Sequence, residues 1–253
     1  MSISEEQYRK FATLTFDDFR KRAQDDSLSK YEKIGFPDSY RQKKEEIIFR
    51  NIVANLPLLN NRGKIVLDVG PGCSDLPLMM VQLCREKGHT LLLVDSEEML
   101  SHLPNEDFIL KFAACFPECE SLFSEFKSKV DVLLTYSVLH GVFAEGNVWD
   151  FLDRSLELLA EGGEMMIGDI PNISKRRRFF SSTCGIKFHQ EFINTQNPPE
   201  VRFNTIERHH IDDSVILALL SRARNQGFDA YVLPQHPELP MANRREDILI
   251  RRP

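Results

Sequence analysis

The sequence predicts an α/β fold: a Rossmann-like, doubly wound, mostly parallel seven-stranded sheet with a C-terminal antiparallel hairpin and an N-terminal helical lid. Three observations predict it. From residue 64 to residue 170, short apolar runs alternate with helical patterns, as in buried parallel strands joined by crossover helices. An amphipathic helix and two closely spaced strand patterns follow. Residues 1–60 carry helical patterns without strand-like alternation.

The elements can be assigned in order along the chain. The N-terminal helices are broken at "DDSLSK" and "GFPDSY", and the last of them covers 41–59. Five parallel strands follow at 64–69, 90–95, 107–113, 131–136 and 164–170, with helical patterns between them. The C-terminal helix is expected within 212–228, with Asp212 as its cap, and the hairpin strands at 229–235 and 246–252. We therefore expect a lid of residues 1–60 on a domain of residues 61–253, with a substrate-side insertion at about 171–210.

Composition excludes several classes of protein. A net charge of -6 argues against nucleic acid as a partner, because phosphate binding over a broad surface needs an excess of Lys and Arg. No apolar run reaches the ~18 residues of a membrane span, and the start of the chain lacks the basic and apolar segments of a secretion signal. Five cysteines without a CxxC pair indicate reduced thiols. We expect a soluble, cytoplasmic protein without a membrane partner, whose oligomeric state stays open.

The stretch "KIVLDVGPGCSD", residues 64–75, carries the main functional signal. The dinucleotide fingerprint G-x-G-x-x-G needs a third glycine, but Asp75 stands there, and a carboxylate at a helix start disfavours a diphosphate. No GKS or GKT follows, which excludes the phosphate-binding loop of nucleotide hydrolases. Asp68 ends the strand before the glycines, and Asp95 ends the next strand, where an acid can bind ribose hydroxyls. The pattern indicates a ligand with a ribose, a positive group and no phosphate.

On these residues the chain from 64 to 253 resembles the class I S-adenosylmethionine-dependent methyltransferases. "LDVGPG" is similar to the family's first motif and Asp95 to its second, while "DVLLTYSVLHGV" and "LLAEGGEMMIGDIPN" are similar to its fourth and fifth strands. The resemblance implies S-adenosylmethionine as cofactor, S-adenosylhomocysteine as its product, and these cofactor-binding residues: Asp68, Gly70, Pro71, Gly72, Asp95, Ser96, Ala114, Tyr136 and Ser137. One departure is that "KFAACFPE" has Ala113, Ala114 and Cys115 at the end of the third strand, where many members have an acid near the adenine. We therefore expect the adenine to bond to backbone amides near Ala114.

Two further segments resemble a narrower group. "FPDSYRQKKEEIIF" and "GDIPNISKRRRFFSS" are similar to small-molecule methyltransferases of bacterial surface-polysaccharide gene clusters. This resemblance implies O-methylation of a small acceptor, such as a sugar hydroxyl or a phosphate- or phosphoramidate-type group, in capsule or other surface-polysaccharide biosynthesis. An anionic or nucleotide-linked acceptor would fit the basic run at residues 175–178.

Three residues are candidates for catalysis. His140 follows the fourth strand on the binding side of the sheet, so it is either a general base or a packing residue beside the cofactor. His189, in the insertion, either reaches the acceptor or is solvated. Asp169 ends the fifth strand and either bonds to a ligand or supports the turn. No metal is expected, because the fourth strand ends in Tyr136 and Ser137 rather than in an acid.

Four residues are candidates for binding the acceptor. Lys175 and Arg176 open a run of four positive charges, which either binds an anion through guanidinium forks or is a solvated face. Tyr40 and Arg41, together with Tyr31 and Phe36, either touch the ligands from the lid or hold the lid to the sheet.

The sequence is also compatible with other functions. A protein or RNA methyltransferase has the same fold, but "TYSVLHG" lacks the Asn-Pro-Pro-Tyr type motif usual in amide and base N-methylating members. A non-catalytic S-adenosylmethionine-binding module would keep the fold and lose the chemistry. A nicotinamide dehydrogenase is disfavoured by Asp75. Binding of S-adenosylmethionine would distinguish the methyltransferases and the binding module from a dehydrogenase.

Overall fold

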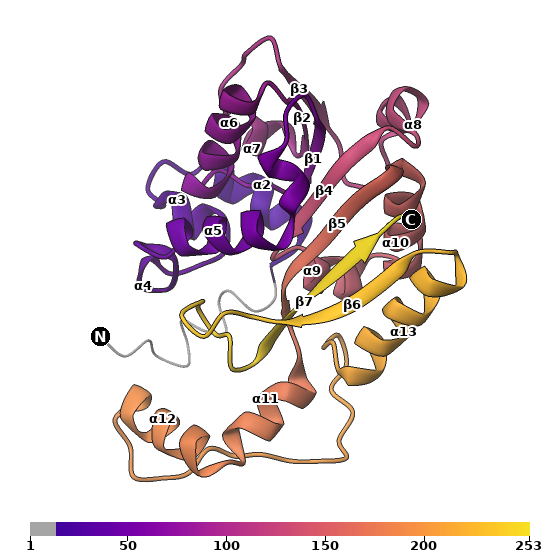
Figure 1. Ribbon diagram of the computed structural model, residues 1–253. Coiled ribbons are helices and arrows are strands. Elements are labelled where there is room, and N and C mark those ends of the chain that lie inside the picture. The colour runs from indigo at the N-terminus through magenta and orange to yellow at the C-terminus, as the bar shows by residue number, and fades with distance from the viewer. Residues whose placement is uncertain (1–13) are drawn as a thin grey trace.

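The computed structural model describes residues 14–253 and contains the predicted seven-stranded sheet (Figure 1). The strand order is β3-β2-β1-β4-β5-β7-β6. The parallel strands are β1 (Ile65–Val69), β2 (Thr90–Asp95), β3 (Ile109–Ala113), β4 (Val130–Tyr136) and β5 (Leu159–Pro171). Since β1 lies between β2 and β4, its carboxyl end is the topological switch point at which doubly wound sheets bind ligands.

The C-terminal hairpin is antiparallel, as the sequence predicted. β6 (Asp229–Pro234) pairs with β7 (Arg245–Arg251), and β7 also pairs antiparallel with β5. The later strand therefore lies inside the sheet, while β6 forms the edge. Burial agrees with this order, because the edge strand β6 is largely exposed, whereas "DILI" of β7 is buried. The proline that ends β6 is also typical of an edge strand.

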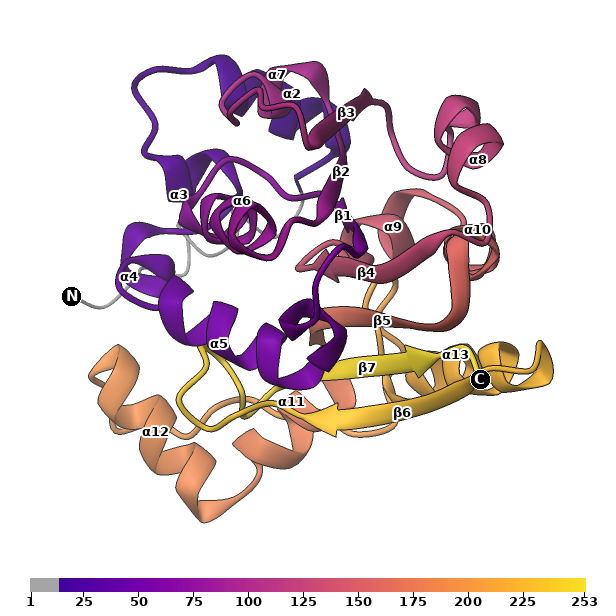
Figure 2. The ribbon, with the colours of Figure 1, turned by 45° about the horizontal axis from the view of Figure 1, so that its top comes forward.

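Each face of the sheet is covered by its own helices (Figure 2). One hydrophobic core joins Leu67 and Leu92 to α8 (Glu120–Phe126), α10 (Val148–Leu158) and α13 (Asp213–Asn225). The other core joins Val66 and Leu91 to α5 (Glu45–Asn55), the 3-10 helix η1 (Pro57–Asn60) and α6 (Asp75–Lys87). Neighbouring residues of one strand thus belong to opposite cores, which follows from the two-residue period of a strand.

Short helices complete the ligand side of the fold. They are α2 (Phe16–Gln24), α3 (Lys30–Lys33), α4 (Asp38–Arg41), α7 (Glu97–Leu100) and α9 (Leu139–Glu145). The helix predicted over 41–59 is interrupted, because Lys43 has a positive φ of 64° and separates α4 from α5. The helix α9, directly after β4, was not predicted. Residues 1–13 of the predicted lid lie outside the described residues.

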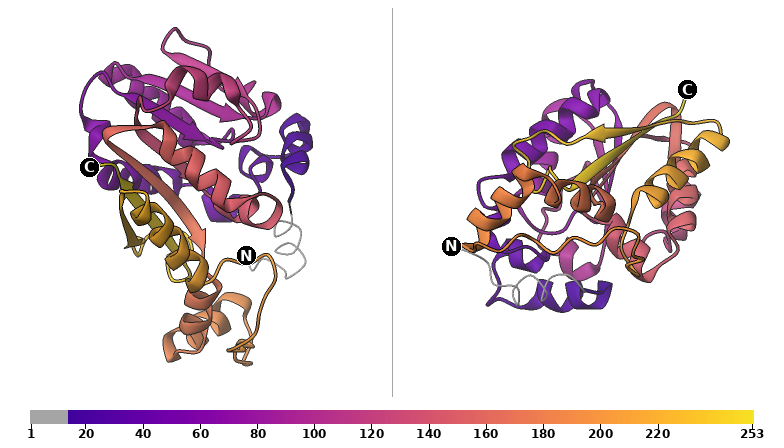
Figure 3. Two further views of the ribbon diagram at one scale, coloured as in Figure 1. Left: turned by 90° about the vertical axis from the view of Figure 1, so that its right-hand side faces the viewer. Right: turned by 90° about the horizontal axis from the view of Figure 1, so that it is seen from below.

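The segment after β5 contains α11 (Ile173–Phe180) and α12 (Thr183–Ile193), and it projects from the sheet (Figure 3). Asn172 caps α11 by accepting hydrogen bonds from the N–H groups of Ser174 and Lys175. The basic run is therefore helical. Asp212 caps α13, as the sequence predicted, by accepting from the N–H of Val215.

Candidate active site

A cavity of about 460 Å³ lies at the carboxyl ends of β1, β2 and β4. Its lining comes from the glycine loop, the first turn after β2, the loop after β3, α9, the start of α10 and the N-terminal helices. Most of the lining is apolar and includes several phenylalanines, among them Phe16, Phe19, Phe36, Phe116 and Phe151. This position and lining are typical of a small-molecule site.

The glycine loop forms one wall of the cavity. Gly70 and Gly72 have φ values of 71° and 66°, a conformation that favours glycine. A Cβ on Gly70 would come within 2.5 Å of Val138 Cγ2, and one on Gly72 within 2.6 Å of Ile34 Cγ2. Both glycines are therefore required by backbone conformation and by close neighbours. Pro71 between them also lines the cavity.

Two carboxylates stand at the ends of β1 and β2 without a cationic partner among the described residues. Asp95 lines the cavity and accepts hydrogen bonds from the backbone N–H groups of Gly72, at 3.0 Å, and Ser96, at 2.7 Å. Burial raises the pKa of Asp95 to about 6. Asp68 is buried and lies outside the cavity lining, and burial together with the charge of Asp95 raises its pKa to about 8. This wall therefore favours a cationic ligand.

The N-terminus of α6, where a dinucleotide-binding fold holds its pyrophosphate, is closed by a carboxylate. Glu45 of α5 accepts a hydrogen bond from the N–H of Leu76 at 2.8 Å. Asp75, the residue in place of the third glycine, accepts from Lys30 Nζ at 2.5 Å and from the Tyr31 hydroxyl at 3.0 Å. Negative charge at this position argues against a diphosphate, as the sequence indicated.

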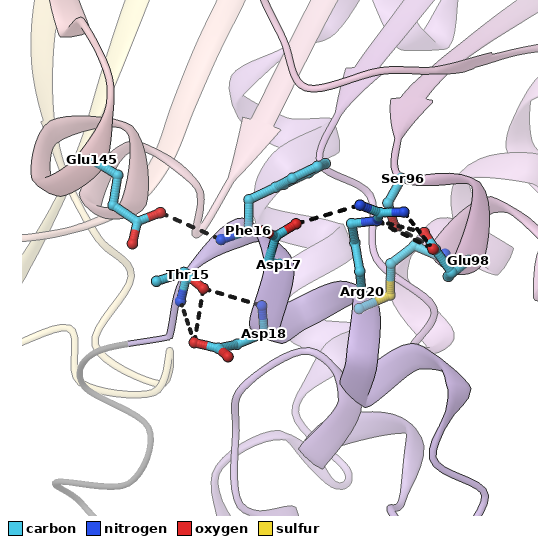
Figure 4. A network of polar contacts seen from close by, with 9 residues as sticks. Thr15, Phe16, Asp17, Asp18, Arg20, Ser96, Glu98 and Glu145 are labelled. Carbon is cyan, nitrogen blue, oxygen red and sulfur yellow. Dashed lines mark hydrogen bonds and ion pairs between the residues drawn. The ribbon is translucent and has the colours of Figure 1, made fainter.

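The helix α2 connects α9 with α7 through polar contacts (Figure 4). On one side the N–H of Phe16 donates to Glu145 of α9 at 3.3 Å. On the other side Arg20 Nη2 donates to Glu98 of α7 at 2.9 Å. Phe16 and Phe19 also line the cavity. The described part of the predicted lid thus contacts both α7 and α9.

The ends of β4 and β5 form a second wall, built on a saturated ion-pair network. Asp169 accepts from Arg245 Nη1 at 2.5 Å and from the Ser137 hydroxyl, and lies 3.7 Å from Arg41 Nη2. Arg41 also donates to Ser137 Oγ at 2.7 Å. Its guanidinium lies 4.3 Å from the centre of the Phe36 ring, so a buried arginine is both paired and stacked. Arg41 and Ser137 line the cavity, while Asp169 lies behind them.

His140, in the first turn of α9, lines the cavity. Its Nδ1 is buried and has no hydrogen-bond partner among the described residues. Burial, together with the charge of Arg245, lowers the pKa of His140 to about 4, and the charge of Asp169 opposes the shift. The imidazole is therefore neutral at physiological pH, and it lines the cavity with its buried Nδ1 unpaired among the described residues.

The remaining predicted residues divide between the cavity and its surroundings. Tyr136 and Ala114 line the cavity, and burial raises the pKa of Tyr136 well above its ordinary value. Ser96 lies outside the lining and caps α7 by accepting from the N–H of Met99 at 3.2 Å. Five residues assigned to catalysis or to the acceptor do not line the cavity: Asp169, Tyr40, Lys175, Arg176 and His189.

The cavity also contains polar residues that the sequence did not single out. They line the same cavity as Ala114 and come from the loop after β3 and from the start of α10: Glu118, Asn147 and Asp150. Asn147 accepts from the N–H of Trp149 at 3.1 Å, so in sequence it is indistinguishable from an ordinary helix cap. The adenine was expected to bond to backbone amides alone, and the structure adds these side chains as possible partners.

Residues 14–253 contain neither a cluster of metal ligands nor a helix that could span a membrane. No group of three or more His, Cys, Asp or Glu side chains is arranged to hold a metal ion, and the expectation of no metal stays a prediction. No described helix is both long and apolar enough to cross a membrane.

Comparison with known proteins identifies the fold. No family model and no curated protein matches this sequence. The solved structure of the CurJ carbon methyltransferase has a TM-score of 0.56 at 15% identity, covering 98% of this chain and 67% of its own. An O-methyltransferase family protein from Burkholderia thailandensis has a TM-score of 0.56 at 14% identity, covering 98% and 66%. The plantazolicin methyltransferase BpumL has a TM-score of 0.56 at 12% identity, covering 99% of both chains.

These comparisons show the fold of S-adenosylmethionine-dependent methyltransferases. The chain spans only 66% of the B. thailandensis protein and 59% of a Haemonchus contortus phosphoethanolamine N-methyltransferase that also shares the fold. The fold predicted from the sequence is thus confirmed. The acceptor and the reaction have to be argued from the site.

Proposed function

We propose that this protein is an S-adenosylmethionine-dependent methyltransferase that acts on a small molecule. The observation that carries the proposal is the wall formed by Asp95 and the two positive-φ glycines, with Asp68 buried outside the lining. Neither carboxyl group has a cationic partner among residues 14–253, and both adjoin the glycine loop. The fold, which is that of S-adenosylmethionine-dependent methyltransferases, supports the same conclusion.

The residues present fit this cofactor. Asp95 is positioned to accept hydrogen bonds from ribose hydroxyls. Asp68 favours the positive end of the ligand, and the backbone at Gly70 and Gly72 can approach it closely. Ala114 with Glu118, Asn147 and Asp150 offers partners for the adenine. When bound, S-adenosylmethionine supplies an electrophilic methyl group on a positively charged sulfur.

His140 is proposed as the general base. Its neutral imidazole can accept the proton that an acceptor hydroxyl loses as the oxygen attacks the methyl carbon. Ordinary packing does not account for a buried, unused Nδ1, because an unmet polar atom costs about 1–3 kcal/mol. A pKa of about 4 makes His140 a weak base, so positioning has to supply much of the rate.

Asp169 is proposed to act through its neighbours rather than on the substrate. Its carboxylate is held by Arg245, Ser137 and Arg41 and lies outside the cavity lining. It fixes Ser137 and Arg41, which do line the cavity and can bind the polar part of a ligand. His189 and Tyr40 stay as predicted contacts for an acceptor that extends beyond the cavity.

The finer proposal is O-methylation of a sugar or of a phosphate- or phosphoramidate-type acceptor in surface-polysaccharide biosynthesis. It is supported by the likeness of two sequence segments and by the hydroxyl-directed base His140. The lining is mostly apolar, so the acceptor would present its reacting group to His140 and keep its charged part outside.

Calorimetry tests the proposal directly. Purified protein should bind both S-adenosylmethionine and S-adenosylhomocysteine, and the Asp95→Ala variant should bind each about tenfold or more weakly, as expected for lost hydrogen bonds to a charged group. Asp229→Ala, which removes an exposed carboxylate from the edge strand, is the matched control and should leave binding unchanged. No binding at millimolar concentration would overturn the assignment.

Activity is then tested with methyl-labelled cofactor and extracts of small metabolites, proteins and RNA. Label transfer to the small-molecule fraction is expected. Transfer to protein or RNA alone would favour the alternative methyltransferases on this fold. Tight binding without any transfer would favour a non-catalytic binding module.

A further inference from the structure

A second hollow among the described residues lies outside the cavity and against α11. It has a volume of about 370 Å³ and lies between α11 and residues 200–207; we call it the α11 groove. Its charged lining consists of three arginines and two glutamates: Arg176, Arg177, Arg202, Glu200 and Glu207. In an acidic protein, three guanidiniums around one hollow are a feature that the proposed function does not explain.

Only one of these arginines has no acidic partner among the described residues. Arg177 donates to Glu207 at 2.6 Å and to the backbone oxygen of Thr205 at 2.9 Å. Arg202 forms an ion pair with Glu200. The Arg176 guanidinium instead lies 5.1 Å from the centre of the Phe180 ring. The groove therefore keeps a positive charge that is stacked but not neutralised.

A second guanidinium is held on the same ring. Arg244, from the connection between β6 and β7, lies 5.7 Å from the centre of Phe180, so the two guanidiniums are within about 11 Å of each other. Phe180 is buried, and its ring contacts the guanidiniums of Arg176, from α11, and Arg244, from the connection between β6 and β7. Guanidinium forks presented in this way suit phosphate and diphosphate oxygens.

The groove lies on the same edge of the sheet as the cavity, because α11 begins two residues after β5 ends (Figure 1). Extended and helical rises limit the distance between the Cα atoms of Asp169 and Arg176 to about 16 Å. Lys175 also donates to the backbone oxygen of Arg245 at 2.7 Å, and Arg245 binds Asp169. Asp169 lies outside the cavity lining but accepts a hydrogen bond from Ser137, which lines the cavity, so a ligand of modest length can reach from the cavity to the groove.

We propose that the α11 groove binds a phosphate or diphosphate group of the acceptor while the methylated end enters the cavity. This inference rests on the proposed function. It assigns the acceptor to the anionic, phosphate-bearing class and gives Arg176, with Arg244 beside it, the role of recognising the anion. It also explains how an apolar cavity can serve a charged acceptor, because the charge stays outside the cavity.

Isothermal titration with inorganic diphosphate tests the proposal on the full chain. Diphosphate should bind the unmodified protein and should bind Arg176→Ala at least about tenfold more weakly, since a hydrogen bond to a charged group contributes ~1.5–3 kcal/mol. Arg244→Ala should weaken it in the same direction. Lys187→Ala is the matched control: it removes a positive charge from the neighbouring α12, where Lys187 pairs with Glu191, and should leave binding unchanged.

Two further measurements make the outcome decisive. S-adenosylmethionine should bind Arg176→Ala as it binds the unmodified protein, so failure of the groove and failure of the cofactor assignment are distinguishable. Vesicles of phosphatidylcholine with and without phosphatidylglycerol test whether the phosphate belongs to a lipid surface. The proposal is overturned if diphosphate does not bind, if Arg176→Ala binds it normally, or if only anionic vesicles respond to that variant.

Discussion

The two walls of the cavity use the same residue type in opposite ways. On the glycine-loop side, Asp68 and Asp95 have raised pKa values and no cationic partner among residues 14–253. On the other side, Asp169 ends β5 and is bound by two arginines and a serine. All three carboxylates lie in the last residues of strands, at one edge of the sheet. The carboxyl groups of the first wall are therefore available to a cationic ligand, whereas the carboxylate of the second wall is already neutralised by arginines of the protein.

The hydrogen bonds behind the second wall support this interpretation. Asp169 has a positive φ of 60°, and its N–H donates to Asp247 at 2.8 Å. Asp247 also accepts from Gln235 at 2.9 Å, and burial raises its pKa to about 6. A residue held by its backbone and its side chain at once is fixed in position, so the second wall holds its shape with or without ligand.

The largest effect on stability is expected when the second wall loses the carboxylate of Asp169. Asp169→Asn leaves the buried Arg41 and the partly buried Arg245 without their shared carboxylate, so it should lower the free energy of unfolding by about 3–5 kcal/mol. Urea denaturation measures it. The matched control is Asp153→Asn, where the same residue type binds Arg222 on the surface and the loss should be below about 1 kcal/mol. Equal losses would remove the contrast between buried and exposed pairs.

The next effect concerns the base between the two walls. His140→Ala should lower kcat by about 10²-fold and leave the dissociation constant of S-adenosylmethionine within a factor of about two. Because the pKa of His140 is about 4, its neutral form dominates above pH 5, and turnover should not fall through its titration between pH 6 and 8. His236→Ala, in the connection between β6 and β7, is the control. Unchanged turnover in His140→Ala would leave it as a packing residue.

A smaller effect is expected at the glycine-loop wall, where the carboxyl groups have no cationic partner among residues 14–253. Asp68 keeps its proton to about pH 8 when folded but loses it near pH 4 when unfolded, so the free protein should lose stability as pH rises between these values. A bound cation favours the ionised carboxylate, so the affinity for S-adenosylmethionine should rise from pH 6 to pH 8 with release of a proton.

Calorimetry in buffers of different ionisation enthalpy measures that proton. Asp68→Asn should remove most of the pH dependence and weaken binding about tenfold at pH 8.5, the equivalent of about 1.4 kcal/mol. Binding that is equally pH-dependent in Asp68→Asn would show that another group carries the charge. The expected control, Asp229→Asn on the exposed edge strand, retains the pH dependence of the unmodified protein.

The smallest effect is expected at the exposed attachment of the N-terminal helices. Lys30→Ala removes an ion pair with Asp75 in which both side chains are at least one third exposed. It should change the free energy of unfolding by no more than about 1 kcal/mol, as measured by urea denaturation. A loss as large as that of Asp169→Asn would mean that the lid is held from this side.

The sequence alone determined the sheet and one wall of the site. Strand and helix periods are local, so the strands were placed within a few residues, and β6 and β7 were recognised as a hairpin. Gly70, Gly72, Asp68 and Asp95 were found because the chemistry of this wall lies within two short segments at the carboxyl ends of β1 and β2. Arg41, Tyr136, Ser137 and His140 were also singled out, and all four line the cavity.

Only the tertiary structure decided how these residues are paired. Arg245 binds Asp169 from 76 positions away, and Glu45 closes α6 from 31 positions away, so no local pattern could reveal either contact. Lys175 and Arg176 looked like part of the main site but lie on α11 outside the cavity. The strand order within the sheet was likewise decided by long-range packing. Charge partners in this fold meet at the carboxyl edge of the sheet, and that edge exists only once distant strands are paired.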